Sequence, residues 1–277
     1  MLYRTLLLIA PGLVCLACAL DAGRLSDRQA GASGFTRVVV TGAGFQHVVY
    51  RNRRTQDSGV LHVYLEGDGS PWLGENRIAR DPGPRNPLML ALMAEDPAPS
   101  LYLGRPCYHG LADDPACNPL MWTSGRYSQP VVASMVRALE KLTSGHDNQG
   151  LVLIGYSGGG TIAMLLAERV QQVRAVVTLA GNLNTDQWTA LHDYSPLVTS
   201  LNPAQRAPLD PRIYQLHVAA ENDRVVPPAL IAAAAARQVQ AQVMIVPGID
   251  HTCCWKTLWP ELLEKLSQHV GPAQAVR

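Results

Sequence analysis

The stretch Gly155-Tyr156-Ser157-Gly158-Gly159 has the Gly-x-Ser-x-Gly spacing that is typical of a nucleophilic serine on a sharp turn. An apolar run at 151–154 precedes it and predicts a strand, and the pattern at 161–170 predicts a helix. Glycines two positions before and after the serine leave room where larger side chains would clash with the strand and the helix. The pattern therefore predicts that Ser157 lies exposed at a strand-to-helix turn, where its hydroxyl could attack a carbonyl carbon.

A serine hydroxyl is a weak nucleophile until a base takes its proton, so a histidine and an orienting carboxylate are expected as partners. When a Gly-x-Ser-x-Gly serine lies between a strand and a helix of an α/β sheet, these partners follow it in the order acid then histidine, each just after a strand. Asp223 follows the predicted strand 213–218, and His251 follows the predicted strand 242–246. Glu221 lies on the same loop as Asp223 and is the alternative acid.

The elements that must position these side chains alternate between short apolar runs and helical patterns from residue 36 onward, which favours an α/β architecture. Runs that are apolar on both faces suit parallel strands covered by helices on each side. The first two strands are expected to form an antiparallel pair. Strands are predicted at 37–41, 46–51, 61–65, 101–103, 151–155, 175–179, 213–218 and 242–246, and helices at 87–94, 130–142, 159–170, 228–239 and 258–270.

Together these residues and elements resemble the α/β-hydrolase fold, and the likeness covers most of 36–270. The sequence Glu-Asn-Asp-Arg-Val-Val-Pro at 221–227 is similar to the acid loop of that family, Gly-x-x-Asp-x-x-Val-Pro, with Ala220 at the glycine position. The resemblance implies a mostly parallel central sheet with helices on both faces and a short lid instead of a full cap domain. It also implies a serine hydrolase of the esterase or lipase type, with Ser157, Asp223 and His251 as nucleophile, acid and base.

Acyl transfer forms an oxyanion that needs at least two preorganised hydrogen-bond donors. The N–H of Gly158, directly after the nucleophile at the helix start, is the expected first donor. The resemblance implies that the second comes from the loop after strand 61–65, where the family often carries His-Gly and a donor residue. Here the loop begins Glu66-Gly67-Asp68, so the backbone of Asp68 takes the donor role and Glu66 stands in place of the usual histidine.

Three long segments without clear periodicity, 67–86, 104–129 and 181–211, are expected to shape the substrate site, since loops that long in a compact domain are more often functional than idle. The last has the size of a small lid. Aromatic side chains on these loops are candidate pocket walls for a small-molecule acyl substrate. They are Trp72, Tyr108, Trp122 and Trp188.

Composition excludes several classes of function. Of 277 residues, 47% are hydrophobic and 16% charged, which supplies one large globular core. Lys and Arg number 23 against 22 Asp and Glu, so the chain lacks the basic excess that nucleic-acid binding needs, and no nucleic-acid partner is expected. No group of His, Cys and carboxylate residues has metal-binding spacing, so neither a metal nor a cofactor is expected.

The first residues predict export. Arg4 followed by a nearly continuous apolar run at 6–17 is typical of a secretory signal, so 1–19 is interpreted as a signal peptide, 20–35 as a flexible tether and 36–277 as the hydrolase domain. Ala17-Cys18-Ala19 fits cleavage before Leu20. Alternatively, Cys15-Leu16-Ala17-Cys18 resembles the bacterial lipoprotein box, in which Cys18 is lipidated and attaches the protein to a membrane. The expected location is periplasmic or outer-membrane, or secreted.

Four cysteines, Cys107, Cys117, Cys253 and Cys254, would meet an oxidising compartment after export. The simplest pairing joins Cys107 to Cys117 across a short loop and leaves a vicinal bridge between the other two. Cross-pairing of the two sets is equally open, so the sequence leaves three connectivities.

The sequence as a whole predicts a serine hydrolase that cleaves a carboxylic ester through an acyl-enzyme on Ser157. The same three residues serve peptidases, thioesterases and acyltransferases, so these remain alternatives. A non-catalytic exported binding protein that retains the fold is the alternative from a different class.

Overall fold

The computed structural model describes residues 22–55, 57, 59–74, 76–144 and 148–270. Their main sheet has eight strands in the order β1-β2-β6-β3-β7-β8-β9-β10. Strand β2 pairs antiparallel with β1 and with β6, and the other neighbouring strands are parallel. The strands are β1 (Thr36–Thr41), β2 (Gln46–Arg51), β3 (Gly59–Leu65), β6 (Ser100–Leu103), β7 (Asn148–Tyr156), β8 (Val173–Leu179), β9 (Tyr214–Ala220) and β10 (Gln242–Val246). This mostly parallel sheet confirms the predicted fold class.

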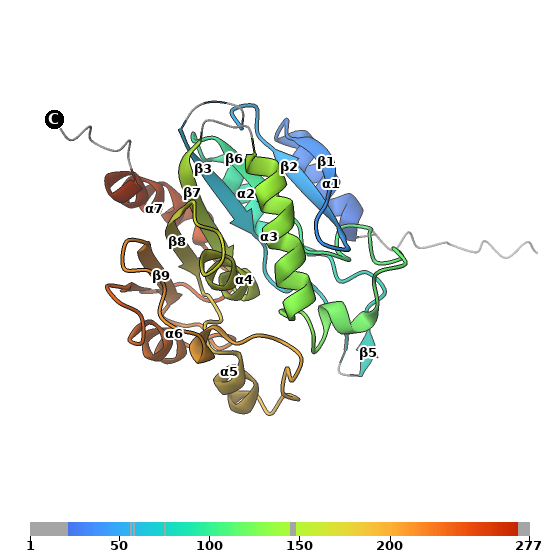
Figure 1. The fold of residues 1–277 in the computed structure, drawn as a ribbon. Coiled ribbons are helices and arrows are strands. Elements are labelled where there is room, and N and C mark those ends of the chain that lie inside the picture. The colour runs from blue at the N-terminus through green and yellow to red at the C-terminus, as the bar shows by residue number, and fades with distance from the viewer. Residues whose placement is uncertain (1–21, 56, 58, 75, 145–147, 271–277) are drawn as a thin grey trace, which may run out of the picture.

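Helices cover both faces of the sheet, and Figure 1 shows α3 and α4 in front of it and α2 behind it. The α-helices are α1 (Ala22–Ala32), α2 (Leu88–Ala94), α3 (Gln129–Thr143), α4 (Gly158–Ala167), α5 (Thr185–Leu191), α6 (Pro228–Ala235) and α7 (Trp255–Val270). Two 3-10 turns, η1 (Pro119–Trp122) and η2 (Pro203–Gln205), and a small ribbon of β4 (Trp72–Leu73) and β5 (Arg77–Ile78) lie in the long loops. Because successive strand residues point to opposite faces, a sheet covered in this way buries nearly every position of its central strands.

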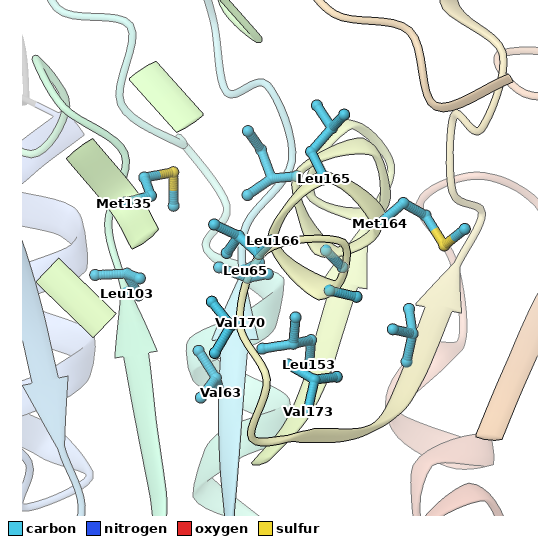
Figure 2. Packing of buried hydrophobic residues seen from close by; sticks show 14 of the residues in the cluster. Val63, Leu65, Leu103, Met135, Leu153, Met164, Leu165, Leu166, Val170 and Val173 are labelled. Carbon is cyan, nitrogen blue, oxygen red and sulfur yellow. The ribbon is translucent and has the colours of Figure 1, made fainter. Parts of the chain in front are cut away.

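Strand β7 illustrates that alternation. Leu151 and Leu153 belong to the core on the side of α3, α4 and α6, whereas Val152 and Ile154 belong to the core on the side of α1, α2 and α7. All four side chains are fully buried. Figure 2 shows the first of these cores, where side chains of β3 and β7 pack against those of α4. Burial of each such side chain contributes roughly 1.5–3 kcal/mol, which explains why the run at 151–154 is apolar throughout.

Helix α1 occupies most of the segment that the sequence suggested as an unpacked tether. Ser26 and Ala30 on this helix are buried, and Asp27 accepts hydrogen bonds from Tyr50 Oη at 2.7 Å and Arg37 Nε at 3.0 Å. The small residues that resemble a linker in the sequence are those that let the helix approach closely: a Cβ on Gly23 would lie 2.8 Å from the carbonyl carbon of His109. Tertiary packing therefore orders a segment whose composition suggests flexibility.

The predicted signal peptide 1–19 and Cys18 lie outside the described residues. Within the part of the chain that the structure describes, no helix combines the length and apolar character needed to cross a membrane.

Candidate active site

Ser157 lies between β7 and α4 with φ 52° and ψ −120°, a backbone conformation that side chains seldom adopt. Three hydrogen bonds hold the turn: its N–H donates to the carbonyl of Leu179 at 2.9 Å, and its own carbonyl accepts from the N–H groups of Gly160 at 2.9 Å and Asn182 at 3.0 Å. The surrounding structure therefore imposes the strained geometry that a nucleophile at the tip of a turn requires.

The two glycines of the motif are sterically required. A Cβ on Gly155 would lie 2.3 Å from the carbonyl oxygen of Gly159, and a Cβ on Gly159 would lie 2.1 Å from the carbonyl oxygen of Leu65. Both distances are far below van der Waals contact with backbone atoms, which cannot easily shift. The reason for the spacing is therefore the close approach of β7, α4 and the end of β3.

His251 joins the serine to the acid. Its Nε2 lies 3.1 Å from Ser157 Oγ, and its Nδ1 lies 2.7 Å from Asp223 Oδ2. The three side chains come from the loops after β7, β9 and β10, at the carboxyl edge of the sheet. They form the linear arrangement in which a carboxylate orients an imidazole and the imidazole can take the proton of a hydroxyl.

The structure also distinguishes the two candidate acids. The Asp223 side chain is buried, and its Oδ1 accepts hydrogen bonds from the N–H groups of Val225 and Val226, both at 2.8 Å. Glu221 is exposed and accepts instead from the N–H of Gly248 at 3.1 Å. Asp223 is thus oriented toward His251, whereas Glu221 bonds to the loop after β10 that carries Gly248.

Two aromatic residues that the sequence analysis did not identify hold the histidine loop. The carbonyl of His251 accepts hydrogen bonds from Tyr156 Oη and from Trp255 Nε1, each at 2.8 Å. Burial, followed by the negative charges of Glu66 and Asp223, raises the pKa of Tyr156 above its usual range, so this hydroxyl stays a donor. Tyr156 occupies the variable position directly before the serine in the Gly-x-Ser-x-Gly motif, and this position is the one feature of the sequence that could have indicated it.

Gly158 and Asp68 lie against each other beside the serine. A Cβ on Gly158 would lie 2.0 Å from Asp68 Oδ1, and a Cβ on Gly67 would lie 3.5 Å from Ser157 Cβ. Neither the Gly158 N–H nor the Asp68 N–H has a hydrogen-bond acceptor among the described residues. Two unpaired amides beside a serine hydroxyl could donate hydrogen bonds to an oxyanion that develops there.

The side chain of Asp68 is part of a buried ionic cluster that sequence reasoning missed. Its carboxylate contacts Arg105 at 2.8 Å, Arg126 at 2.8 Å and the hydroxyl of Tyr127 at 2.7 Å. Burial tends to raise the pKa of Asp68, but the attraction of Arg126 and Arg105 outweighs it and lowers that pKa to about 2. Asp68 is therefore ionised at neutral pH and holds both guanidinium groups. We call these four residues the Asp68 cluster.

Glu66, at the start of the same loop, is a buried carboxyl group. Burial raises its pKa to about 7, although hydrogen bonds from the N–H groups of Met89 and Gly67 and the charge of Arg105 oppose the rise. Glu66 thus occupies the place of the family's usual histidine as a group that titrates near neutral pH.

The four aromatic candidates for the pocket wall differ in exposure. Trp72 is 42% exposed on β4, and Trp188 is half-buried, with its Nε1 donating to the carbonyl of Val225 at 2.8 Å. Tyr108 is buried and its hydroxyl donates to the carbonyl of Asp68 at 3.1 Å. Trp122 is 3% exposed and packs in a small core of the 104–129 loop, so it supports that loop and offers little ring surface.

The structure pairs Cys107 with Cys117 and Cys253 with Cys254. The first bridge has a Cα–Cα distance of 5.6 Å and closes part of the 104–129 loop. The second lies two residues after His251. Among the described residues, no group of three or more His, Cys, Asp or Glu side chains is arranged to hold a metal ion.

Comparison with known proteins adds a family and a set of structural neighbours. The model of the dienelactone hydrolase family matches residues 98–256. The esterase Est1E from Butyrivibrio proteoclasticus, in a structure with bound ferulic acid, is similar with a TM-score of 0.62 and 12% identity over 85% of this chain and 100% of its own. An esterase from Pyrococcus furiosus has a TM-score of 0.58 and 12% identity over 86% of this chain and 93% of its own. No curated protein matches the sequence.

Proposed function

The chain belongs to the dienelactone hydrolase family, and we propose that it is a serine hydrolase that cleaves a carboxylic ester through an acyl-enzyme formed on Ser157. The single observation that carries the proposal is the chain of two hydrogen bonds from Ser157 Oγ through His251 to Asp223. A buried acid, a histidine and a serine on a strained turn have little structural reason to be arranged in this way unless the hydroxyl reacts.

In the proposed first half-reaction, Ser157 Oγ attacks the acyl carbon while His251 Nε2 takes the hydroxyl proton. Asp223 keeps the Nδ1–H of His251 directed at its carboxylate and stabilises the imidazolium that forms. The tetrahedral intermediate then collapses, the C–O bond of the ester breaks, and the alcohol leaves with the proton from Nε2. Water, activated by the same nitrogen, attacks the acyl-enzyme and releases the acid and free Ser157.

The oxyanion of both tetrahedral intermediates would accept hydrogen bonds from the N–H groups of Gly158 and Asp68. The lack of competing acceptors for these two amides supports the assignment, because preorganised donors need no rearrangement when charge develops. Trp72 and Trp188, which expose ring surface on the long loops, are proposed to contact the acyl or alcohol part of the substrate.

The proposal is tested with a fluorophosphonate probe and a panel of aryl and alkyl esters, amides and thioesters. We expect the wild-type protein to be labelled on Ser157 and to hydrolyse esters fastest, and Ser157→Ala to lose labelling and to lose about 10⁶-fold in kcat. Ser267→Ala, an exposed serine of α7 whose hydroxyl bonds only within its helix, is the matched control. Hydrolysis retained in Ser157→Ala would overturn the mechanism, and faster cleavage of amides or thioesters would overturn the ester assignment. A protein with neither labelling nor turnover would be a binding module.

We also propose that the protein is exported, on the basis of the signal-like pattern at 1–19, and that Cys18 attaches it to a membrane. Labelling of cells with an alkyne fatty acid tests the attachment. Incorporation that disappears in Cys18→Ala supports a lipoprotein, and a mature protein beginning at Leu20 without lipid would show secretion or a free periplasmic form instead.

A further inference from the structure

The Asp68 cluster joins the two loops that would stabilise the oxyanion. Asp68 lies on the loop after β3, and its carboxylate touches the position of Gly158 at the start of α4. The groups that hold this carboxylate come from a third segment, the 104–129 loop: Arg105 and Arg126 each contribute an ion pair at 2.8 Å. One carboxylate is thus the meeting point of three separate loops.

The cluster and the neighbouring Tyr108 together fix the backbone around the proposed donor. The Arg105 guanidinium donates to the carbonyl of Glu66 at 3.2 Å, and the Tyr108 hydroxyl donates to the carbonyl of Asp68 at 3.1 Å. The peptide that carries the Asp68 N–H lies between these two anchored peptides. Because a peptide unit is planar and turns only at the flanking φ and ψ angles, anchoring both neighbours restricts the direction of that N–H.

The charges are arranged to tolerate an anion. Two guanidinium groups surround one carboxylate, and the side chains of Arg105 and Arg126 are 4% and 8% exposed. Removing charges from water is costly, so a cluster of this kind stabilises a protein little compared with apolar side chains of similar size. The surplus of positive charge beside Gly158 would instead favour negative charge that develops on a neighbouring oxygen.

From these contacts we propose that the Asp68 carboxylate, held by Arg105, Arg126 and Tyr127, is the positioning group of the oxyanion hole. It sets the Asp68 N–H and the first turn of α4 at a fixed separation and screens its own negative charge from the oxyanion with two arginines. The inference rests on the proposed hydrolase function. It differs from a purely structural role because it predicts weaker binding of the transition state with unchanged binding of the substrate.

The chain offers a matched pair of variants for the test. Tyr127 and Tyr64 are both fully buried, and each donates its hydroxyl to an aspartate carboxylate, Asp68 in one case and Asp96 in the other. Tyr64→Phe removes such a bond on the opposite face of the sheet from Tyr127, away from the oxyanion loops. Asp68→Asn is the stronger perturbation. Tyr127→Phe keeps both ion pairs, so it still tests the inference if Asp68→Asn does not fold.

For each variant we would measure kcat and KM on an aryl ester, the inhibition constant of a trifluoromethyl ketone that forms a tetrahedral adduct, and the melting temperature. We expect kcat to fall about 10-fold in Tyr127→Phe and about 10²-fold in Asp68→Asn, with KM changed less than about 3-fold and ketone affinity reduced in parallel with kcat. Tyr64→Phe should lower the melting temperature and leave kcat and ketone affinity at wild-type values.

Folded Tyr127→Phe and Asp68→Asn proteins with wild-type kcat and ketone affinity would overturn the inference while leaving the hydrolase proposal intact. Equal effects of Tyr64→Phe and Tyr127→Phe would also overturn it, since they would show a general effect of stability. A wild-type protein that the fluorophosphonate probe does not label would overturn the proposed function itself, which makes the two failures distinguishable.

Discussion

Glu66 makes stability depend on pH in a direction opposite to that of an ordinary paired carboxylate. The side chain is buried beside the proposed oxyanion loop, and burial raises its pKa from 4.5 to about 7. Between these two values the folded protein keeps the proton while the unfolded chain has lost it. Stability therefore falls as pH rises from about 4.5 to about 7. Above that range the contribution of Glu66 is constant, because its carboxyl group is ionised in both the folded and the unfolded state.

The size of the effect follows from the pKa difference. Each pKa unit corresponds to about 1.4 kcal/mol, so ionised Glu66 destabilises the folded state by about 3 kcal/mol, and most of this stability is lost between pH 5 and pH 8. Glu66→Gln removes this titration. Its single amide oxygen can accept from only one of the N–H groups of Met89 and Gly67, which now donate to different carboxylate oxygens, and loss of the other bond lowers stability equally at every pH. We expect the free energy of unfolding of the variant to rise by about 2 to 3 kcal/mol relative to that of the wild type on going from pH 5 to pH 8.

The assay is urea unfolding of both proteins at pH 5, 6, 7 and 8, followed by tryptophan fluorescence and circular dichroism. Comparing differences between proteins cancels the other titrating groups, including Asp68, whose lowered pKa acts only in more acidic solution. Glu261→Gln, at an exposed position of α7, is the control, and its free energy of unfolding should differ from that of the wild type by a constant amount across this pH range. A constant free-energy difference between wild type and Glu66→Gln across this range would refute the reasoning.

The packing around Gly158 and the bridge between Cys107 and Cys117 can each be tested by substitution. Gly158→Ala would place a methyl group 2.0 Å from Asp68 Oδ1 and 2.4 Å from Tyr127 Oη, so we expect kcat to fall by about 10²-fold or more as the oxyanion loop is displaced; steady-state ester hydrolysis checks it, and near-normal turnover would contradict the close approach. Replacing both Cys107 and Cys117 by alanine opens a loop with a sequence separation of 10, which should cost about 3 kcal/mol in urea unfolding. An unchanged unfolding midpoint in that double variant would show that the bridge contributes no stability.

The sheet could be predicted because its signals are local. Runs such as 151–154 are short and apolar at every position, a pattern that suits a strand covered on both faces. The positions of Ser157, Asp223 and His251 could be predicted for a related reason: each lies on the connection after an apolar strand, and the carboxyl ends of parallel strands in one sheet meet at one edge.

The rest depends on contacts between segments that carry no periodic signal. Asp68 lies 37 positions from Arg105 and 58 from Arg126 along the chain, and both arginines belong to an irregular loop, so nothing in the sequence indicates that they share one carboxylate. Trp122 was expected at the pocket wall, but the same loop folds into its own small core around it. Helix α1 escaped prediction because its buried face consists of small residues such as Ser26 and Ala30, whose fit depends on the surface that receives them.

Because α1 is an ordered helix, the segment that could separate the folded domain from a membrane at Cys18 is short. If Cys18 carries a lipid, only four residue steps separate it from the start of the helix at Ala22, and an extended chain covers at most about 14 Å in that distance. A tether reaching to Thr36 would have allowed about 65 Å. The catalytic domain would thus stay close to the membrane surface. Ester substrates that dissolve in or adsorb to the membrane would then meet it at a much higher local concentration than those in bulk solution.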